Sequence, residues 1–200
     1  IGPNGTKAQI IGGGSATLVP YYESHPIEAF KSSLNDNTLI RSSKGCHTYR
    51  YLPEINKSLT KEDGFLVEYF NVTEDGNDFI SSKILTGSKF WIFEGFAKDI
   101  IGGDGKPDIL VKFSCCYTPN ITGEHNFEIF AIGKSKLLID ETEIIDNWTN
   151  TSPGDAFFAH GTSSKRGSKV LKKDKTYKIE IQYKFEGNFP AIYIGCQPPD

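Results

Sequence analysis

Methionine is absent from this 200-residue sequence, which contains only two tryptophans and four cysteines. An excess of one charge is lacking as well, because 22 Lys and Arg oppose 25 Asp and Glu for a formal net charge of −3. A chain with this balance has no electrostatic basis for binding nucleic acid or an anionic membrane. No apolar run approaches the roughly 20 residues of a membrane-spanning helix, so neither nucleic acid nor a membrane is an expected partner.

The cysteines, Cys46, Cys115, Cys116 and Cys196, do not form the C-x-x-C pairs of a zinc ribbon. Because Cys115 and Cys116 are neighbours in a strand-like run, their side chains should point to opposite faces of a sheet. Buried free thiols are the expected state, although an even number of cysteines also permits a disulfide. The four histidines show no pairing that indicates a zinc site or a catalytic dyad. No cofactor and no metal are therefore expected.

Aromatic residues and glycine are abundant, with 14 Phe, 9 Tyr and 20 Gly, a profile that favours β structure over helical bundles. The clearest pattern runs from Thr122 to Trp148, where Phe127, Ile129 and Ala131 alternate with other residues in the period of a half-buried strand. About ten short strands at roughly 8–15-residue spacing indicate a sandwich or barrel. Strands are expected at 65–70, 89–95, 109–118, 126–132, 136–139, 144–145, 168–171, 176–185 and 191–196.

The first sixty residues follow a different pattern. Residues 25–34 predict a helix, because Pro26 suits a first turn and apolar residues follow at helical spacing. Short strands are expected at 1–4 and 38–40, which with the helix would form a partial α/β (βαβ) segment. The glycine-rich stretch 10–16 lacks the G-x-x-x-x-G-K-Ser/Thr pattern of a nucleotide-binding loop, so it predicts a flexible turn.

Two motifs in the second half resemble those of the PA14 domain, a β-sandwich module found in bacterial toxins, yeast adhesins and some glycosidases. They are GKSKLLIDETEIIDNW and KTYKIEIQYKF. An earlier run, FLVEYF, resembles the opening strand of the same domain. The resemblance implies a mainly β fold, an antiparallel PA14 β-sandwich over residues 63–197, with Leu137, Ile139 and a buried Trp148 in its framework.

The beginning of the chain resembles glycoside hydrolase family 3. IGPN, GGGSATLVPYY, SHPIEAF and Gly45-Cys46 occur in the order in which that family begins its second, α/β-sandwich domain, after a (β/α)8-like barrel. Some fungal β-glucosidases of this family carry a PA14 domain inserted at this point, so the two resemblances explain each other. They imply that residues 1–62 start the family 3 α/β-sandwich domain and that 63–197 are the insert. The chain, which opens on Ile1, looks cut out of a longer polypeptide.

The resemblance further implies a parent β-glucosidase that hydrolyses terminal non-reducing β-D-glucosyl residues by a retaining, two-carboxylate mechanism. In family 3 the nucleophilic Asp comes from the barrel, and the acid/base Glu comes from the second domain downstream of the insert. No catalytic residue is therefore assigned here, and the fragment alone should not hydrolyse glycosides. Expected partners are β-glucosides or oligosaccharides and the remaining family 3 catalytic domains, and a homo-oligomer is left open.

Phe157 and Phe158 are the candidate substrate-binding residues. Two adjacent aromatic residues in a polar loop between Gly154 and Gly161 are unusual as simple core, and sugars offer apolar C–H faces to aromatic rings. The resemblance implies that such a Phe-Phe loop reaches over the catalytic pocket and narrows the space for the leaving group. The alternative is that both rings anchor the loop on the sandwich. Trp91, by contrast, is expected in the core.

Two other functions are considered: a non-catalytic carbohydrate-binding or adhesin-type PA14 module, and a toxin-type module acting through protein contacts. The family 3-like opening argues against both. PA14 lectins hold Ca²⁺ with two adjacent Asp residues, which this chain lacks, and Asp104 and Asp108 are expected in a solvated turn. Six Asn-x-Ser/Thr sequons favour secretion slightly over a cytoplasmic location, although a surface rich in Ser and Asn explains them too. The sequons are those of Asn4, Asn56, Asn71, Asn120, Asn147 and Asn150.

Overall fold

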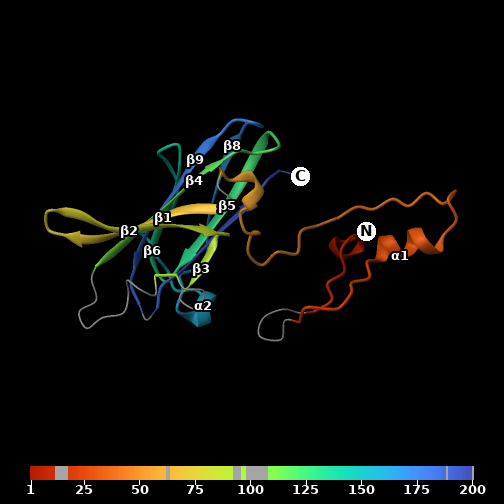
Figure 1. Cartoon of the computed structure of the whole chain (residues 1–200), viewed down its shortest axis with the longest axis horizontal. Coiled ribbons are helices and arrows are strands. Elements are labelled where there is room, and N and C mark those ends of the chain that lie inside the picture. The colour runs from red at the N-terminus through yellow and green to blue at the C-terminus, as the bar shows by residue number, and fades with distance from the viewer. Residues whose placement is uncertain (12–17, 62–63, 92–95, 98–107, 188, 200) are drawn as a thin grey trace. The chain divides into compact units, whose positions relative to one another are not determined.

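The computed structural model describes residues 1–11, 18–61, 64–91, 96–97, 108–187 and 189–199. The chain folds as two compact units, Ile1–Arg50 and Tyr51–Asp200 (Figure 1). The family-domain boundary predicted between residues 62 and 63 stays a prediction, because a compact unit and a family domain are different divisions of a chain. Among the described helices, none combines the length and the apolar character needed to cross a membrane.

The first unit contains one α-helix, α1 (Pro26–Ser33), and a short 3-10 helix, η1 (Pro3–Gly5). The predicted helix is thus confirmed, with proline in its first turn and His25 at its N-cap position. No residue of α1 is buried, so the helix has no packed face within the described part of the unit.

The two strands predicted on either side of this helix, at 1–4 and 38–40, do not form in the structure, whose described residues in this unit contain no strand. A strand requires a neighbour that pairs its backbone N–H and C=O groups. Apolar residues remain outside any core as a result, and Leu39 is 74% exposed. Most of the glycine-rich stretch, at 12–17, lies outside the described residues.

The second unit is a sandwich of two antiparallel sheets, as predicted. One sheet has six strands in the order β2-β1-β4-β9-β6-β7, and the other has four in the order β3-β10-β5-β8. A 3-10 helix, η3 (Lys57–Leu59), and a helical turn, α2 (Ala156–Ala159), lie outside the sheets. The strands are β1 (Gly64–Thr73), β2 (Gly76–Thr86), β3 (Lys89–Trp91), β4 (Ile109–Tyr117), β5 (Gly123–Ala131), β6 (Gly133–Ile139), β7 (Thr142–Asn147), β8 (Lys165–Leu171), β9 (Tyr177–Phe185) and β10 (Ala191–Gln197).

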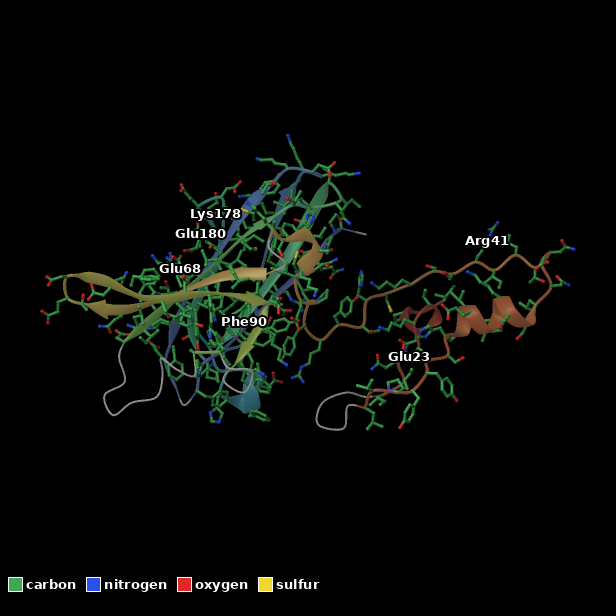
Figure 2. All side chains as sticks on the ribbon, viewed as in Figure 1. Glu23, Arg41, Glu68, Phe90, Lys178 and Glu180 are labelled. Carbon is green, nitrogen blue, oxygen red and sulfur yellow. The ribbon has the colours of Figure 1, made fainter. Side chains whose placement is uncertain are left out.

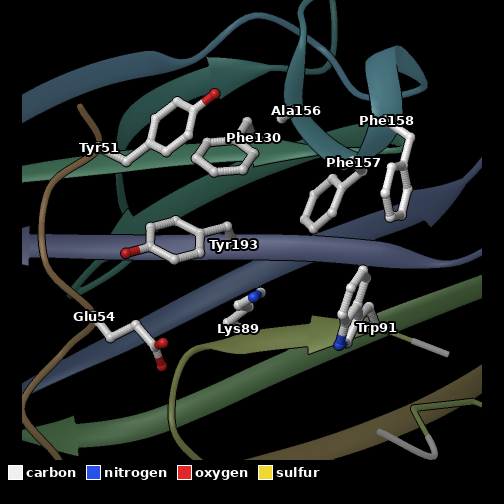
Figure 3. A pocket seen from close by; sticks show the side chains of 9 residues that line it. All are labelled: Tyr51, Glu54, Lys89, Trp91, Phe130, Ala156, Phe157, Phe158 and Tyr193. Atoms are coloured by element: carbon white, nitrogen blue, oxygen red, sulfur yellow. The ribbon is translucent and has the colours of Figure 1, made fainter. Parts of the chain in front are cut away.

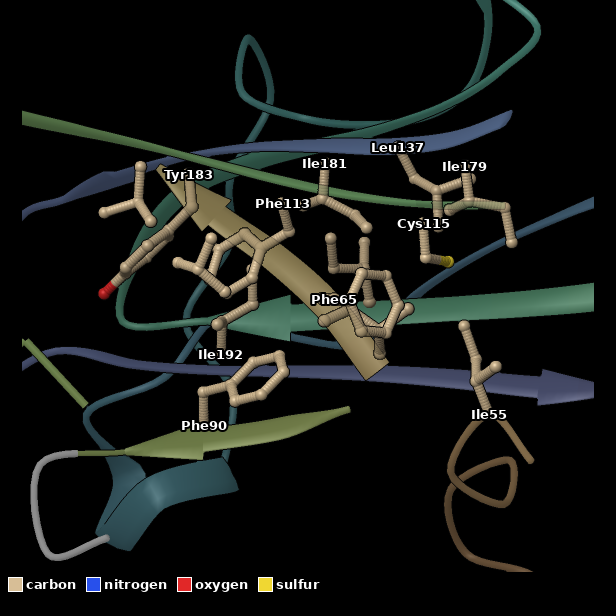
Figure 4. Packing of buried hydrophobic residues seen from close by; sticks show 14 of the residues in the cluster. Ile55, Phe65, Phe90, Phe113, Cys115, Leu137, Ile179, Ile181, Tyr183 and Ile192 are labelled. Atoms are coloured by element: carbon tan, nitrogen blue, oxygen red, sulfur yellow. The ribbon is translucent and has the colours of Figure 1, made fainter. Parts of the chain in front are cut away.

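The core lies between the sheets, where alternate residues of facing strands meet (Figure 4). On β9, Ile179, Ile181 and Tyr183 are fully buried, while the residues between them are partly exposed. Leu137 and Ile139 of β6 are also fully buried, as the sequence predicted. Burying one such aliphatic side chain contributes about 1.5–3 kcal/mol, so this interior is the main source of the sandwich's stability.

Most strands lie within a few residues of their predicted positions, and β2 is the exception. Every residue of β2 is exposed or half-exposed, so no apolar alternation marks it in the sequence. The end of the strand predicted at 89–95 falls outside the described residues. Cys115 is buried and its neighbour Cys116 is exposed, which confirms that the two side chains point to opposite faces of the sheet.

The outer faces of the two sheets differ in character. The six-stranded sheet presents charged side chains, among them Lys178 and Glu180, whose Nζ and Oε1 atoms are 2.9 Å apart (Figure 2). The four-stranded sheet instead carries Trp91, Phe130 and Tyr193 on the face opposite the core. This group of aromatic side chains marks the four-stranded sheet as the place to look for a binding site.

Candidate functional site

The outer face of the four-stranded sheet contains a cleft of about 380 Å³ (Figure 3). Its floor consists of three aromatic side chains on neighbouring strands: Trp91 on β3, Tyr193 on β10 and Phe130 on β5. Their described neighbours in the chain, Phe90, Ile129, Ala131, Ile192 and Ile194, belong to the core. The two-residue period of a strand therefore places the three rings on the opposite surface.

Stacked rings occupy one end of the cleft. Tyr193 and Phe130 are directly opposite each other across β10 and β5, with ring centroids 4.8 Å apart and planes inclined by 10°. Tyr51 packs against both rings, with its centroid 4.5 Å from that of Phe130 and 6.3 Å from that of Tyr193. Phe130 is thereby left only 4% exposed. It supports the neighbouring rings, whereas Tyr51 and Tyr193 remain partly open to the cleft.

The turn α2 forms the opposite wall, and its backbone is strained. Phe157, Phe158 and Ala159 have φ values of 50°, 61° and 63°. This left-handed conformation costs an L-residue on the order of 1 kcal/mol or more. The loop is closed at its base by Gly154, whose N–H donates to the carbonyl of Gly161 at 2.9 Å. Such a turn persists only where its surroundings hold it in place.

The two phenylalanines of the turn have different environments. The half-buried Phe157 ring lies 5.5 Å from that of Phe130 and 6.5 Å from that of Trp91, centroid to centroid. Phe158 is 72% exposed, and its ring is nearly parallel to that of Trp91 at 6.3 Å. The pair therefore divides: Phe157 packs on the sandwich, and Phe158 presents an open ring face beside the cleft.

Polar groups stand among these rings. Lys89 Nζ lies 4.9 Å from the centroid of the Trp91 ring, and Glu54 lines the cleft from the segment that precedes the sheets. Burial raises the pKa of Tyr193 to about 12, and the nearby carboxylates of Glu54 and Glu128 add to the shift. The Tyr193 hydroxyl therefore stays protonated at neutral pH and acts as a donor.

Residues 51–55, the lead-in segment, lie against β10 of the four-stranded sheet and are held there by hydrogen bonds. Tyr193 donates its hydroxyl to the Leu52 carbonyl at 2.7 Å, and the Cys196 N–H donates to the Pro53 carbonyl at 2.8 Å. Glu54 forms an antiparallel bridge with Gly195.

A fully buried carboxylate, that of Glu128 on β5, lies beneath the lead-in segment. It accepts hydrogen bonds from the Leu52 N–H and the Ser164 hydroxyl, and from Arg166 Nε at 3.0 Å. Three donors, one of them charged, compensate the loss of hydration that burial imposes on a carboxylate. Glu128 thus fixes the lead-in segment to the sheet and with it one wall of the cleft.

Residues 93–188 match the family model described as "PA14 domain". The chain contains a PA14 domain. The chain as a whole is 33% identical over 186 residues to a probable beta-glucosidase I from Aspergillus terreus. This alignment covers 92% of this chain and 22% of that protein. It is 27% identical over 211 residues to a beta-glucosidase from Rhizobium radiobacter, covering 100% of this chain and 24% of that protein.

The fold of the PA14-containing chain is also found in a solved structure. The beta-glucosidase from Kluyveromyces marxianus superposes on it with a TM-score of 0.75 at 19% identity, covering 100% of this chain and 25% of that one. The chain therefore spans about a quarter or less of the relatives it matches. At this identity the structural likeness shows the fold alone.

Both tryptophans differ from expectation. Trp91 is not in the core: it lies in the cleft, because Phe90 occupies the core position and adjacent strand residues face opposite ways. Trp148 is half-buried rather than buried, and Lys136 Nζ lies 5.8 Å from the centroid of its ring. It follows the last residue of β7, where the sheet ends and solvent reaches the ring.

Several cleft residues were not predicted from the sequence. The alternation that places Ile129 and Ala131 in the core also places Phe130 on the other face, and the same holds for Tyr193 between two isoleucines. That signal is present in the sequence. Tyr51 and Glu54 have no such signal, because they belong to an irregular segment whose path depends on distant residues.

The described residues contain no group of three or more His, Cys, Asp or Glu side chains placed to hold a metal ion. Asp108 instead pairs with Lys184, with 2.8 Å between Oδ2 and Nζ, and its side chain is 46% exposed. Asp104 lies outside the described residues.

Proposed function

We propose that this chain is the PA14-containing segment of a family 3 β-glucosidase that removes terminal β-D-glucosyl residues, and that its aromatic cleft shapes access to the catalytic pocket. The single observation that carries the proposal is the exposed Phe158 ring beside Trp91, on the domain that the β-glucosidase relatives share. The catalytic carboxylates and the rest of the family 3 domains are supplied by the parent protein.

The chemistry of the cleft suits a sugar. Aromatic ring faces pack against the apolar C–H faces of a pyranose, and a few polar groups fix its hydroxyls. Here Phe158 and Trp91 offer the ring faces, Lys89 offers a donor and Glu54 an acceptor. A glycoside held by its leaving group in this cleft would extend toward a catalytic pocket built by other domains, where two carboxylates perform the retaining hydrolysis.

The contribution of Phe158 follows from its exposure. Full burial of a Phe side chain is worth about 1.5–3 kcal/mol, so covering about half of this ring with a sugar contributes about 0.75–1.5 kcal/mol. That corresponds to about a three- to tenfold effect on kcat/KM. In the full-length enzyme, Phe158→Ala should lower kcat/KM for a disaccharide by this factor and shift the preference toward longer oligosaccharides, because the narrowing ring is gone.

Phe79→Ala provides a matched control, since Phe79 is an exposed phenylalanine on β2, 58% exposed, outside the cleft. The ratio of kcat/KM for cellobiose to that for cellotetraose should change in Phe158→Ala and not in Phe79→Ala. An unchanged ratio in Phe158→Ala would refute the role of the ring. A parent protein that binds oligosaccharides without hydrolysing any would instead favour the non-catalytic carbohydrate-binding module.

A further inference from the structure

We propose that Tyr51 is a positioning residue that holds the Phe157–Phe158 turn in place and thereby sets the width of the cleft. Its consequence for catalysis rests on the proposed function above, whereas its effect on the turn does not. The turn needs such a support, because three consecutive L-residues in the left-handed region are unfavourable in isolation.

The hydroxyl of Tyr51 reaches the start of the turn. It donates to Asp155 Oδ1 at 3.0 Å, and Asp155 occupies the N-cap position of α2. A carboxylate at that position commonly accepts from the N–H groups of the following turn. Asp155 makes no such capping bond. Its side chain is thus directed toward Tyr51, a residue 104 positions away in the chain.

The ring of Tyr51 reaches the turn by a second route. It packs on Phe130 at 4.5 Å between centroids, and Phe130 in turn packs on Phe157 at 5.5 Å. An exposed hydrogen bond alone contributes little to the stability of the turn. Here the ring contacts hold the Tyr51 side chain in place, so its hydroxyl is already positioned to bond Asp155. The hydroxyl thus connects Tyr51 to Asp155 at the start of the turn, and the ring connects it to Phe157 through Phe130.

Tyr51 is itself fixed from behind. The next residue, Leu52, donates its N–H to buried Glu128 and accepts the Tyr193 hydroxyl at 2.7 Å. Tyr51 is also the first residue of the second compact unit, joined directly to Arg50 at the end of the first. The point at which the chain enters the sandwich is therefore also the point that supports the aromatic turn, so a displacement of the lead-in segment is transmitted to the cleft wall.

Hydrogen exchange in the full-length protein tests the support itself. Tyr51→Phe removes the hydroxyl and keeps the ring, so exchange in a peptide spanning residues 154–163 should become about threefold to tenfold faster, the loss expected for one such hydrogen bond. The amides of His160 and Gly161, which bond to Phe157 and Ala156 within the turn, report on it directly.

Two further variants make the result specific. Asp155→Ala removes the same bond from the other side, so the Tyr51→Phe/Asp155→Ala double variant should exchange no faster than Asp155→Ala alone. Tyr177→Phe removes another tyrosine hydroxyl, one that accepts the Lys172 N–H at 2.9 Å away from the cleft, and should leave the turn unchanged. Unchanged exchange in Tyr51→Phe, or additive effects in the double variant, would overturn the proposal.

The substrate ratio separates this inference from the proposed function. If both hold, Tyr51→Phe shifts the cellobiose-to-cellotetraose ratio in the same direction as Phe158→Ala but by a smaller factor. If Phe158→Ala leaves the ratio unchanged while Tyr51→Phe loosens the turn, the support stands and the proposed function fails. If Phe158→Ala shifts the ratio and Tyr51→Phe does not, the positioning role of Tyr51 is contradicted.

Discussion

Replacing Glu128 with alanine tests whether one buried carboxylate holds the lead-in segment to the sheet. Glu128 is fully buried and accepts from three donors, on Leu52, Ser164 and Arg166. Arg166 is 55% exposed at its side chain, so water can replace its lost partner. The Leu52 N–H is buried and cannot be rehydrated without local opening, at a cost of about 1–3 kcal/mol.

Adding the cavity left by the truncated side chain, we expect Glu128→Ala to lower the free energy of unfolding by about 2–4 kcal/mol. Urea unfolding followed by circular dichroism measures this value, with an unchanged slope against urea if the native fold is retained. Asp108→Ala is the matched control, because it removes a carboxylate that is 46% exposed and pairs with Lys184. Surface pairs of this kind contribute about 0–1 kcal/mol.

A loss in Glu128→Ala no larger than that in Asp108→Ala would refute the reasoning. It would mean that the lead-in segment is held by its other bonds and that the buried carboxylate is dispensable. Faster amide exchange in residues 51–55, with an unchanged free energy of global unfolding, would show that Glu128 stabilises the segment locally and not the whole sandwich.

Three other predictions concern the sandwich. Gly195→Ala should lower the free energy of unfolding in urea by about 1–3 kcal/mol, because a Cβ there would lie 2.8 Å from the Leu52 carbonyl oxygen, a backbone atom that cannot move away easily. An unchanged free energy of unfolding would show that the lead-in segment does not pack closely on Gly195. Burial raises the pKa of the Cys115 and Cys196 thiols to about 12 from 9.0. The unfolded chain therefore loses these protons first, and the free energy of unfolding should fall as pH rises above 9.0 toward 12. In the native chain at pH 8, a thiol reagent should label exposed Cys116 and spare both buried thiols; equal labelling would contradict their burial.

Much of the sandwich can be predicted from its sequence because its strands are half-buried. In β9, Ile179, Ile181 and Tyr183 are fully buried and alternate with partly exposed residues, so local pattern and global fold agree. The strand β2 is not predictable in this way, because none of its residues is buried and only its end, at Leu85, packs against the core. Its position follows from its pairing with β1, a property of two segments rather than one.

The first unit shows the opposite limit. The helix α1 is predicted correctly from residues within it, since a proline at its start and its spacing are local signals. The strands predicted beside it depend on partners elsewhere in a sheet, and the described residues of this unit do not form them. Helices keep their hydrogen bonds within one segment, whereas strands do not.

The candidate site is predictable in part. The Phe157–Phe158 pair stands out in the sequence as two aromatic residues in a polar loop, but the sequence does not say which one is exposed. That difference arises from the left-handed turn and from the contact of Phe157 with Phe130. Trp91 reaches the cleft because a neighbouring phenylalanine takes the core position, and Tyr51 reaches it because its segment is bound to distant strands.

The most direct test of the central claim is a crystal structure of the full-length protein with a non-hydrolysable disaccharide, such as a thio-linked analogue of cellobiose. The account predicts a sugar ring within van der Waals contact, about 4 Å, of the Phe158 side chain, with its reducing end toward the cleft. A disaccharide bound in the catalytic pocket with no contact to Phe158 or Trp91, or a cleft filled by another part of the protein, would contradict it.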